Sequence, residues 1–344
     1  MVRHVVQRLI LMVGTLIGVL TVTFVLTHIL PGSPVEVMLG HRPTPDQIEA
    51  AKHQLGLDLP LWQQYLRFLG EITQGHFGTS FLTSQPVLQD IGERLMATVE
   101  LTTLAMICII VIGIPIGVLS AVKANSPIDH VVRSLSVAGV ALPGFMLGML
   151  LQMAFYGGLH WLPLQGRMTS AILLDHHFPR VTGLFLVDTV LAGDWVAFRD
   201  AAAHIVLPLA TLALANLPLV ARTTRNLMVE ALNEDHVRTA FAYGLPRRDI
   251  YFRYALKATL IPLLTVIGLT YGYLLGGAVV AEYVFDWPGI GSYVVRAMVQ
   301  SDYPAAIGVT MFLATAYLMI NLVVDLLYFA VDPRLRIEKS GAAH

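Results

Sequence analysis

The chain has 344 residues, of which 56% are hydrophobic and 13% are charged, and its formal net charge is −1. Soluble domains are roughly one quarter charged, so this composition excludes an ordinary water-soluble protein and indicates a chain surrounded largely by lipid. The nearly neutral charge gives no reason to expect nucleic acid as a partner.

The first predicted element is a membrane-spanning helix at the N-terminus. An apolar run of 22 residues extends from Leu9 to Leu30, after a basic start that contains Arg3 and Arg8. A helix of this length measures about 33 Å, which is enough to cross a bilayer core of about 30 Å. The run resembles a signal peptide, but no A-x-A cleavage pattern follows it, so residues 1–30 are predicted to be a retained signal anchor.

The next segment, residues 31–96, is predicted to be helical and to lie on the extracytoplasmic side. Thr44 can cap a helix whose first residue is Pro45, and Gln47 completes the pattern of a capping box. Pro60 can begin a second helix in the same segment. We therefore expect a folded structure outside the membrane rather than an irregular loop.

Five further apolar runs are long enough to cross a membrane, which predicts an all-α polytopic membrane protein with six transmembrane helices. They are Leu101–Val122, Leu135–Leu159, Ala201–Ala221, Ala258–Ala281 and Ala305–Val331. Residues 97–335 then form a core with five spans, and residues 336–344 form a tail.

The distribution of Lys and Arg predicts the orientation of the spans. An even number of spans places both termini on one side, and the segments on that side hold 14 of the 22 Lys and Arg residues. Seven of these 14 lie in the loop 222–257. Because basic loops stay in the cytoplasm, both termini and this loop are predicted to be cytoplasmic.

Three amide side chains inside the predicted spans are candidates for a translocation path. They are Gln152, Asn216 and Asn321. An amide that faces lipid is costly, so each is expected to face the helix bundle or a water-filled path. For Gln152 and Asn216, a simple hydrogen bond to a neighbouring helix is an equally good explanation.

The motifs of several enzyme classes are absent from the sequence. There is no G-x-x-x-x-G-K-[ST] phosphate loop, no H-E-x-x-H zinc motif and no G-x-S-x-G nucleophile elbow. His176 and His177 are adjacent, but consecutive residues do not share one face of a helix. We therefore predict no catalytic residue, no metal site and no resident cofactor in this chain.

The loop 222–257 is predicted to form a helical elbow. The apolar spacing indicates one amphipathic helix over Leu227–Tyr243. Gly244 can adopt the left-handed conformation that ends a helix, and Pro246 can begin the next one. A helix that lies on anionic lipid would explain the same basic residues, so that alternative stays open.

Seven segments of the sequence resemble the membrane subunits of ABC importers. RTAFAYG at 238–244 resembles their EAA-x-x-x-G cytoplasmic loop, and six others resemble the first permease of the dipeptide, oligopeptide and nickel branch. These six are LPGSP (30–34), LGLDLPLWQQYLRFL (55–69), GHFGTSF (75–81), ALPGFMLG (141–148), AEYVFDWPGIG (281–291) and VDPRLR (331–336). Each segment is short, but their common order over nearly the whole chain makes the resemblance specific.

The resemblance implies the MetI-like fold of a type I importer permease, in which residues 97–335 are the permease core and form half of a translocation pathway. It also implies that the loop 222–257 carries a coupling helix that inserts into a groove of an ATPase subunit. The residues implied in this contact are Arg238, Thr239, Ala240, Phe241, Gly244, Leu245 and Pro246. Arg238 stands where the wider family has an acid, so no salt bridge from an acidic residue is carried over to this position.

The resemblance further implies the partners, the location and the cargo. The partners are a second homologous permease, two ABC ATPase subunits that bind ATP and Mg²⁺, an extracytoplasmic solute-binding protein and membrane lipid. The location is a bacterial inner membrane, and the cargo is a dipeptide or oligopeptide, although nickel or another small solute would use the same motifs. An ion-coupled transporter is less favoured, because paired intramembrane acids and an internal repeat are not found in the sequence.

Overall fold

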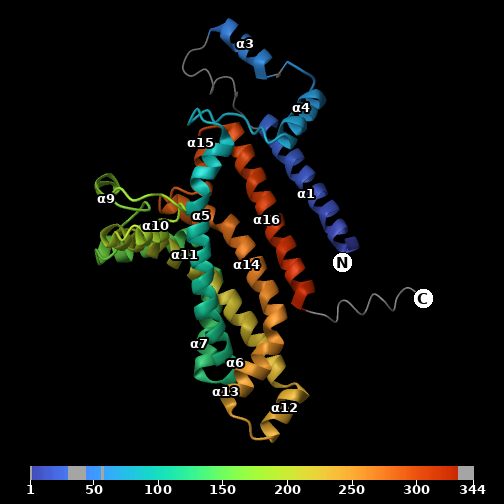
Figure 1. Ribbon diagram of the computed structural model, residues 1–344, viewed down its shortest axis with the longest axis vertical. Coiled ribbons are helices and arrows are strands. Elements are labelled where there is room, and N and C mark those ends of the chain that lie inside the picture. The colour runs from blue at the N-terminus through green and yellow to red at the C-terminus, as the bar shows by residue number, and fades with distance from the viewer. Residues whose placement is uncertain (1, 30–43, 56–57, 332–344) are drawn as a thin grey trace, which may run out of the picture. The chain divides into compact units, whose positions relative to one another are not determined.

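The computed structural model describes residues 2–29, 44–55 and 58–331, and within these ranges the chain is almost entirely helical (Figure 1). The predicted all-α class is therefore confirmed for the described residues. Parts of the predicted segments lie outside them, namely Leu30, residues 31–43, residues 56–57 and residues 332–344, which include the predicted tail.

The chain divides into two compact units. The first contains residues 1–97 and 288–318, and the second contains residues 98–287 and 319–344. Two long helices, α5 (Val87–Cys108) and α16 (Tyr303–Val331), contribute residues to both units.

The first unit contains most of the predicted extracytoplasmic helices. Its other helices are α1 (Val2–Ile29), α3 (Pro45–Leu55), α4 (Leu61–Thr73) and α15 (Ile290–Val299). The predicted capping box is confirmed, because the Thr44 N–H donates to Gln47 Oε1 at 2.9 Å and the Gln47 N–H donates to Thr44 Oγ1 at 3.4 Å. The predicted start after Pro60 is also confirmed, since Pro60 is the N-cap residue of α4.

A buried polar network connects α5, α15 and the start of α16 within the first unit. The Tyr293 hydroxyl donates to Asp90 Oδ2 at 2.7 Å, and the Ser80 hydroxyl donates to Asp302 Oδ2 at 2.5 Å. Burial raises the pKa of the Tyr293 phenol well above its usual range, so the hydroxyl remains a donor. Asp302 also caps α16 by accepting from the Ala305 N–H at 3.3 Å.

The second unit is built around α11, which packs against α6, α7, α8, α10 and α14. Its elements are α6 (Ile114–Val122), α7 (Pro127–Ala141), α8 (Gly144–Leu151), α9 (Ser170–Asp175), α10 (Phe185–Leu191), α11 (Trp195–Leu232), α12 (Asp235–Ala242), α13 (Arg247–Asp249), α14 (Leu256–Val284) and the π-helical segments η1 (Ile109–Gly113), η2 (Gln152–Gly158) and η3 (Ile250–Ala255). Small residues allow the close approach of these helices. A Cβ atom on Gly117 of α6 would lie only 2.6 Å from the Ala221 carbonyl oxygen of α11.

Five helical stretches among the described residues are long and apolar enough to cross a membrane. They are Val6–Val25, Val87–Val122, Trp195–Leu232, Arg247–Val284 and Tyr303–Val324. These stretches correspond to five of the six predicted spans, and the helical structure expected for each of them is confirmed.

The remaining predicted span, Leu135–Leu159, is not one continuous helix. Helix α7 ends at Ala141, Leu142 is extended with φ −90° and ψ 125°, and α8 begins at Gly144. The cause is Pro143, which lacks a backbone N–H and disfavours helical geometry in the residue before it. The apolar helix that follows, Gly144–Gly158, is shorter than the other five stretches.

Candidate functional site

The predicted elbow consists of α12 and the turn behind it, residues 234–246, and lies at one end of the second unit (Figure 1). The prediction of one helix over Leu227–Tyr243 is wrong, because α11 ends at Leu232 and α12 begins at Asp235. The side-chain amide of Asn233 donates to the Val229 carbonyl at 2.8 Å. A polar side chain that binds nearby backbone groups competes with helix continuation, which accounts for the break.

The end of α12 is fixed by Gly244, as predicted. This residue has φ +70°, in the left-handed region. The Gly244 N–H donates to the Phe241 carbonyl at 3.0 Å, and the Leu245 N–H donates to the Ala240 carbonyl at 3.3 Å. These two bonds form a Schellman motif, and they turn the chain sharply at the tip of the elbow.

One face of α12 is buried against the rest of the second unit. Val237 and Ala240 belong to a hydrophobic cluster with residues of α6, α11 and η3. The buried partners are Val118, Ala121, Met228, Ala231, Ile250 and Ala255. Because η3 leads directly into α14, the elbow is packed against one long helix and continuous with another.

The opposite face of the elbow is exposed. Of the seven residues predicted to contact an ATPase, Ala240 is buried, and the other six are exposed: Arg238, Thr239, Phe241, Gly244, Leu245 and Pro246. The Phe241 ring packs edge-on against Tyr251, with the ring centroids 6.4 Å apart. Ala240 therefore holds the elbow in place, while the other six residues form a surface available to a partner.

A buried ion pair supports the same end of the unit. Asp129 of α7 accepts from the Arg225 guanidinium of α11 at 2.6 and 2.8 Å, and from the Ser120 hydroxyl at 2.6 Å. The bond from Arg225 is the main reason that the pKa of the Asp129 carboxyl lies well below its usual range. Sequence reasoning missed this pair, because 96 residues separate the partners and no local pattern joins them.

A second buried ion pair lies toward the other end of α11. The Arg167 guanidinium donates to Glu100 of α5 at 2.5 and 3.0 Å and to the Gly183 carbonyl at 2.7 Å. The guanidinium also lies 3.8 Å from the centroid of the Phe185 ring, and Phe185 packs in a cluster with Ala197 of α11. This pair attaches the segment before α11 to α5, and no local pattern in the sequence predicts it because 67 residues separate the partners.

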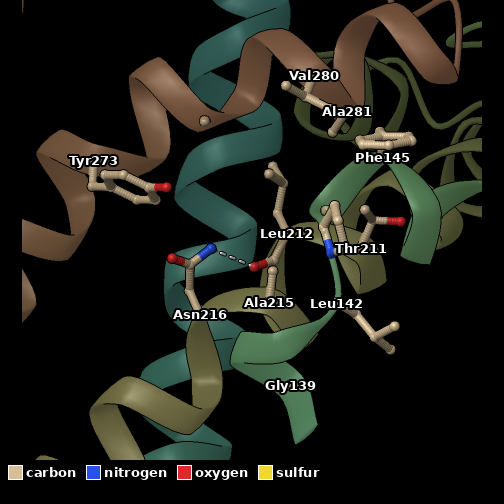
Figure 2. Close-up of a pocket in the computed structure, with 13 residues that line it drawn as sticks. Gly139, Leu142, Phe145, Thr211, Leu212, Ala215, Asn216, Tyr273, Val280 and Ala281 are labelled. Carbon is tan, nitrogen blue, oxygen red and sulfur yellow. Dashed lines mark hydrogen bonds between the residues drawn. The ribbon is translucent and has the colours of Figure 1, made fainter. Parts of the chain in front are cut away.

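Between these two ends, a cavity of about 380 Å³ opens against the middle of α11 (Figure 2). It is lined by residues from the α7–α8 break, from α11 and from α14: Gly139, Leu142, Pro143, Gly144, Phe145, Thr211, Leu212, Ala215, Asn216, Tyr273, Gly277, Val280 and Ala281. The lining contains no Asp, Glu, Lys, Arg or His. The break at Pro143 thus contributes a wall of the cavity, a consequence that the sequence reading did not anticipate.

The three predicted path residues have different environments. Asn216 lines the cavity and donates from Nδ2 to the Leu212 carbonyl at 2.9 Å (Figure 2). Gln152 is not in the cavity lining, and its Nε2 donates to the carbonyls of Leu164 and Val284, both at 3.1 Å. Asn321 is also outside the lining, and its Oδ1 is buried without a hydrogen-bond partner among the described residues. Only Asn216 is therefore positioned at this cavity.

Sequence reasoning missed the other polar residues of the cavity, Thr211 and Tyr273. Thr211 donates its hydroxyl to the Leu207 carbonyl of its own helix at 2.9 Å. Figure 2 shows the Tyr273 side chain on the same side of the cavity as Asn216. Both residues are common inside apolar helices, so only their position on facing helices distinguishes them.

Comparison with known proteins places most of the chain in families of transport proteins. Residues 113–337 match the family of binding-protein-dependent transport system inner membrane components. Residues 1–102 match the N-terminal family of binding-protein-dependent transport system membrane components. Together these two matches include most of the residues of both units.

Three curated relatives align with nearly the full chain. A probable D,D-dipeptide transport system permease of Escherichia coli K12 is 43% identical over 318 residues, which cover 92% of this chain and 93% of the relative. A dipeptide transport system permease of the same strain is 40% identical over 342 residues, which cover 98% of this chain and 100% of the relative. A glutathione transport system permease of Salmonella paratyphi A is 35% identical over 336 residues, which cover 98% of this chain and 99% of the relative.

The five membrane-length helices among the described residues define a polytopic membrane protein, and α11 and α14 of these line a neutral cavity, as a transport protein requires. The chain belongs to the binding-protein-dependent transport system inner membrane component family. It is therefore a non-catalytic permease subunit of an ABC importer in the inner membrane, as the sequence resemblance implied.

Proposed function

We propose that this permease imports dipeptides or oligopeptides, and that the cavity on α11 is its contribution to their path. The uncharged lining is the observation that carries this proposal. A free peptide is zwitterionic and varies in its side chains, so a path without fixed charges can pass many peptides. A bare cation such as Ni²⁺ would require imidazole, thiolate or carboxylate ligands, and the cavity lining offers none of these.

The relatives support the same class of cargo. The three described above are named for D,D-dipeptide, dipeptide and glutathione transport. These cargoes are all short peptides, and the chain aligns with each relative over at least 92% of its own length. Peptide transport is therefore the function favoured for this chain over nickel transport.

The proposed mechanism couples the elbow to the cavity through two helices. The exposed face of the elbow would insert into an ATPase subunit. This face is formed by Arg238, Thr239, Phe241, Gly244, Leu245 and Pro246. The elbow packs on α11 and continues through η3 into α14, and both α11 and α14 line the cavity. A displacement of the elbow by the ATPase would therefore move two walls of the cavity and alternate its access.

The coupling must supply enough free energy to shift the permease from one access state to the other. Shifting a two-state equilibrium from 1:99 to 99:1 requires about 5.5 kcal/mol of differential stabilisation. The burial of Val237 and Ala240 makes the elbow a rigid part of the bundle, so a displacement of the elbow also displaces the helices that pack against it. ATP and Mg²⁺ would be bound by two separate ATPase subunits, and this chain would supply only the moving wall.

The proposed topology keeps the boundaries predicted from the sequence. The signal anchor is 1–30, the extracytoplasmic segment is 31–96, the permease core is 97–335 with the cytoplasmic loop 222–257, and the tail is 336–344. Both termini are proposed to be cytoplasmic, on the side of the elbow. A second permease would complete the pathway, and an extracytoplasmic binding protein would deliver the peptide.

The cargo can be tested with the complete transporter reconstituted in liposomes with its binding protein. We expect ATP-dependent uptake of a labelled dipeptide and no uptake of labelled Ni²⁺ under the same conditions. Uptake of Ni²⁺ without peptide uptake would overturn the proposed cargo. Uptake in the absence of ATPase subunits would instead contradict the proposed role of the elbow.

A further inference from the structure

Helix α4 is amphipathic but has no buried residue in the structure. Its polar face contains Gln63, Arg67 and Glu71, and the Arg67 guanidinium donates to Glu71 Oε1 at 2.9 Å. Its other face is apolar over nearly half of the helix circumference. An isolated helix with such a face needs an apolar surface to cover it.

Part of this apolar face is fixed to α1. The hydroxyl oxygens of Tyr65 and Thr21 are hydrogen-bonded at 2.6 Å. The Phe24 ring of α1 lies with its centroid 5.2 Å from that of Tyr65 and 5.5 Å from that of Phe68. Figure 1 shows α4 beside the C-terminal end of α1, and these contacts hold it there.

The contacts with α1 also set the depth of α4 relative to a bilayer. The membrane-length stretch of α1 is Val6–Val25, and the contacts come from Thr21 and Phe24. The predicted span ends at Leu30, so at about 1.5 Å per residue Phe24 lies about 9 Å inside that end. Interfacial helices insert to about 5–10 Å at the boundary between headgroups and acyl chains, a range that includes the level of Phe24.

A second part of the apolar face is left uncovered by the residues that the structure describes. Trp62 and Leu66, which lie four residues apart on the same face, are 62% and 57% exposed, and Leu61 is 63% exposed. At the same level, α1 exposes Val22 and Val25, as a lipid-facing span should. The exposed stripe of α4 therefore continues an apolar surface that lies in the membrane.

We propose that α4 lies in the membrane interface, with Leu61, Trp62 and Leu66 inserted among the lipid headgroups and the upper acyl chains. Tryptophan is enriched at this level of the bilayer, where its ring is in an apolar layer and its N–H in a polar one. The Arg67–Glu71 pair on the opposite face would then be directed to water. This inference rests on α1 crossing the membrane, and in the proposed topology the leaflet is the outer one.

The consequence is an anchor for the extracytoplasmic segment. Helix α4 would hold residues 58–86 against the bilayer, so that a binding protein meets this segment at a fixed height above the membrane. A protein partner that covers the same stripe is the competing occupant. The depth of α4 favours lipid, because a soluble partner would have to reach into the interface to cover Trp62 and Leu66.

The test uses the complete transporter in lipid nanodiscs with a single labelled cysteine. Cys108 is first replaced by serine (Cys108→Ser). A bimane label is then attached at Leu66→Cys on the apolar face. Glu71→Cys on the polar face is labelled as the matched control. We expect the label at 66 to emit at shorter wavelength and to be quenched by lipids brominated in their acyl chains. The label at 71 should instead be quenched by iodide in the buffer. Trp62→Cys gives a second position on the stripe if Leu66→Cys does not assemble.

Three outcomes would overturn the proposal. These are equal iodide quenching at both positions, equal lipid quenching at both positions, and protection of the label at 66 only after the binding protein is added. The last outcome would assign the stripe to a protein surface. Because the label reports lipid contact without transport, an inactive but lipid-quenched transporter would count against the proposed function alone.

Discussion

The two ends of α11 and its middle differ in one property, which is charge. Each end is attached to neighbouring helices by a buried arginine–carboxylate pair, Arg225 with Asp129 at one end and Arg167 with Glu100 toward the other. The middle lines a cavity without a single charged residue. Because the two ion pairs lie away from the cavity, its lining presents no fixed charge that would hold a charged group of a peptide.

The largest effect is expected from breaking the pair near the elbow. Asp129→Ala leaves the Arg225 guanidinium without its carboxylate, and loss of one partner of a buried pair costs about 3–5 kcal/mol. The midpoint of thermal unfolding in detergent should fall strongly. Asp249→Ala is the matched control, because Asp249 and Arg253 form an exposed pair 3.5 Å apart. Exposed pairs contribute about 0–1 kcal/mol, so similar shifts in the two variants would contradict the comparison.

The next effect comes from placing a charge in the neutral cavity. Ala215 lines the cavity, and Ala215→Asp would set a carboxylate there, with Ala215→Asn as an uncharged control of nearly the same size. Two like charges about 8 Å apart repel by about 2 kcal/mol at an effective dielectric constant of about 20, which is roughly 30-fold in rate. Uptake of an acidic dipeptide should therefore fall by this factor relative to a neutral one. If Ala215→Asp and Ala215→Asn take up acidic and neutral dipeptides in the same ratio, the cavity is not on the path.

A smaller effect is expected at the turn of the elbow. A Cβ atom at Gly244 would meet no atom within 4 Å, but φ is +70° there. Left-handed geometry costs a residue with a Cβ atom about 1–2 kcal/mol, and least for Asn. Gly244→Val should therefore reduce ATP-coupled uptake by roughly tenfold while the protein still folds, and Gly244→Asn should retain most of it. Full uptake by Gly244→Val would show that the geometry of the turn does not matter for coupling.

The smallest effect concerns pH. The pKa of Asp129 is depressed in the folded protein, so its contribution to stability is present above its unfolded pKa of about 3.9 and is lost as pH falls through the folded value. The difference in unfolding midpoint between the wild type and Asp129→Asn should stay constant from about pH 7 to pH 5. It should narrow only below about pH 4. A difference that changes near neutral pH would contradict this assignment of the charged pair.

Local signals predicted a large part of the fold and of the elbow. Five of the spans, the capping box at Thr44 and the left-handed turn at Gly244 all depend on residues close together in sequence. The break at Asn233 was missed because it depends on whether a polar side chain bonds its own helix or points to solvent. The break at Pro143 had a local signal, which a long apolar run on either side obscured.

The sequence by itself determined that this is a helical membrane protein, which family it belongs to, and where its elbow turns. These properties follow from hydrophobic length and from residue types that restrict the backbone at one position. Only the tertiary structure decided that Asn216, Ala215 and Tyr273 share a neutral cavity and that Asp129 pairs with Arg225. Contacts of this kind join residues that are far apart in sequence, and they are selected by helix packing, which no local pattern encodes.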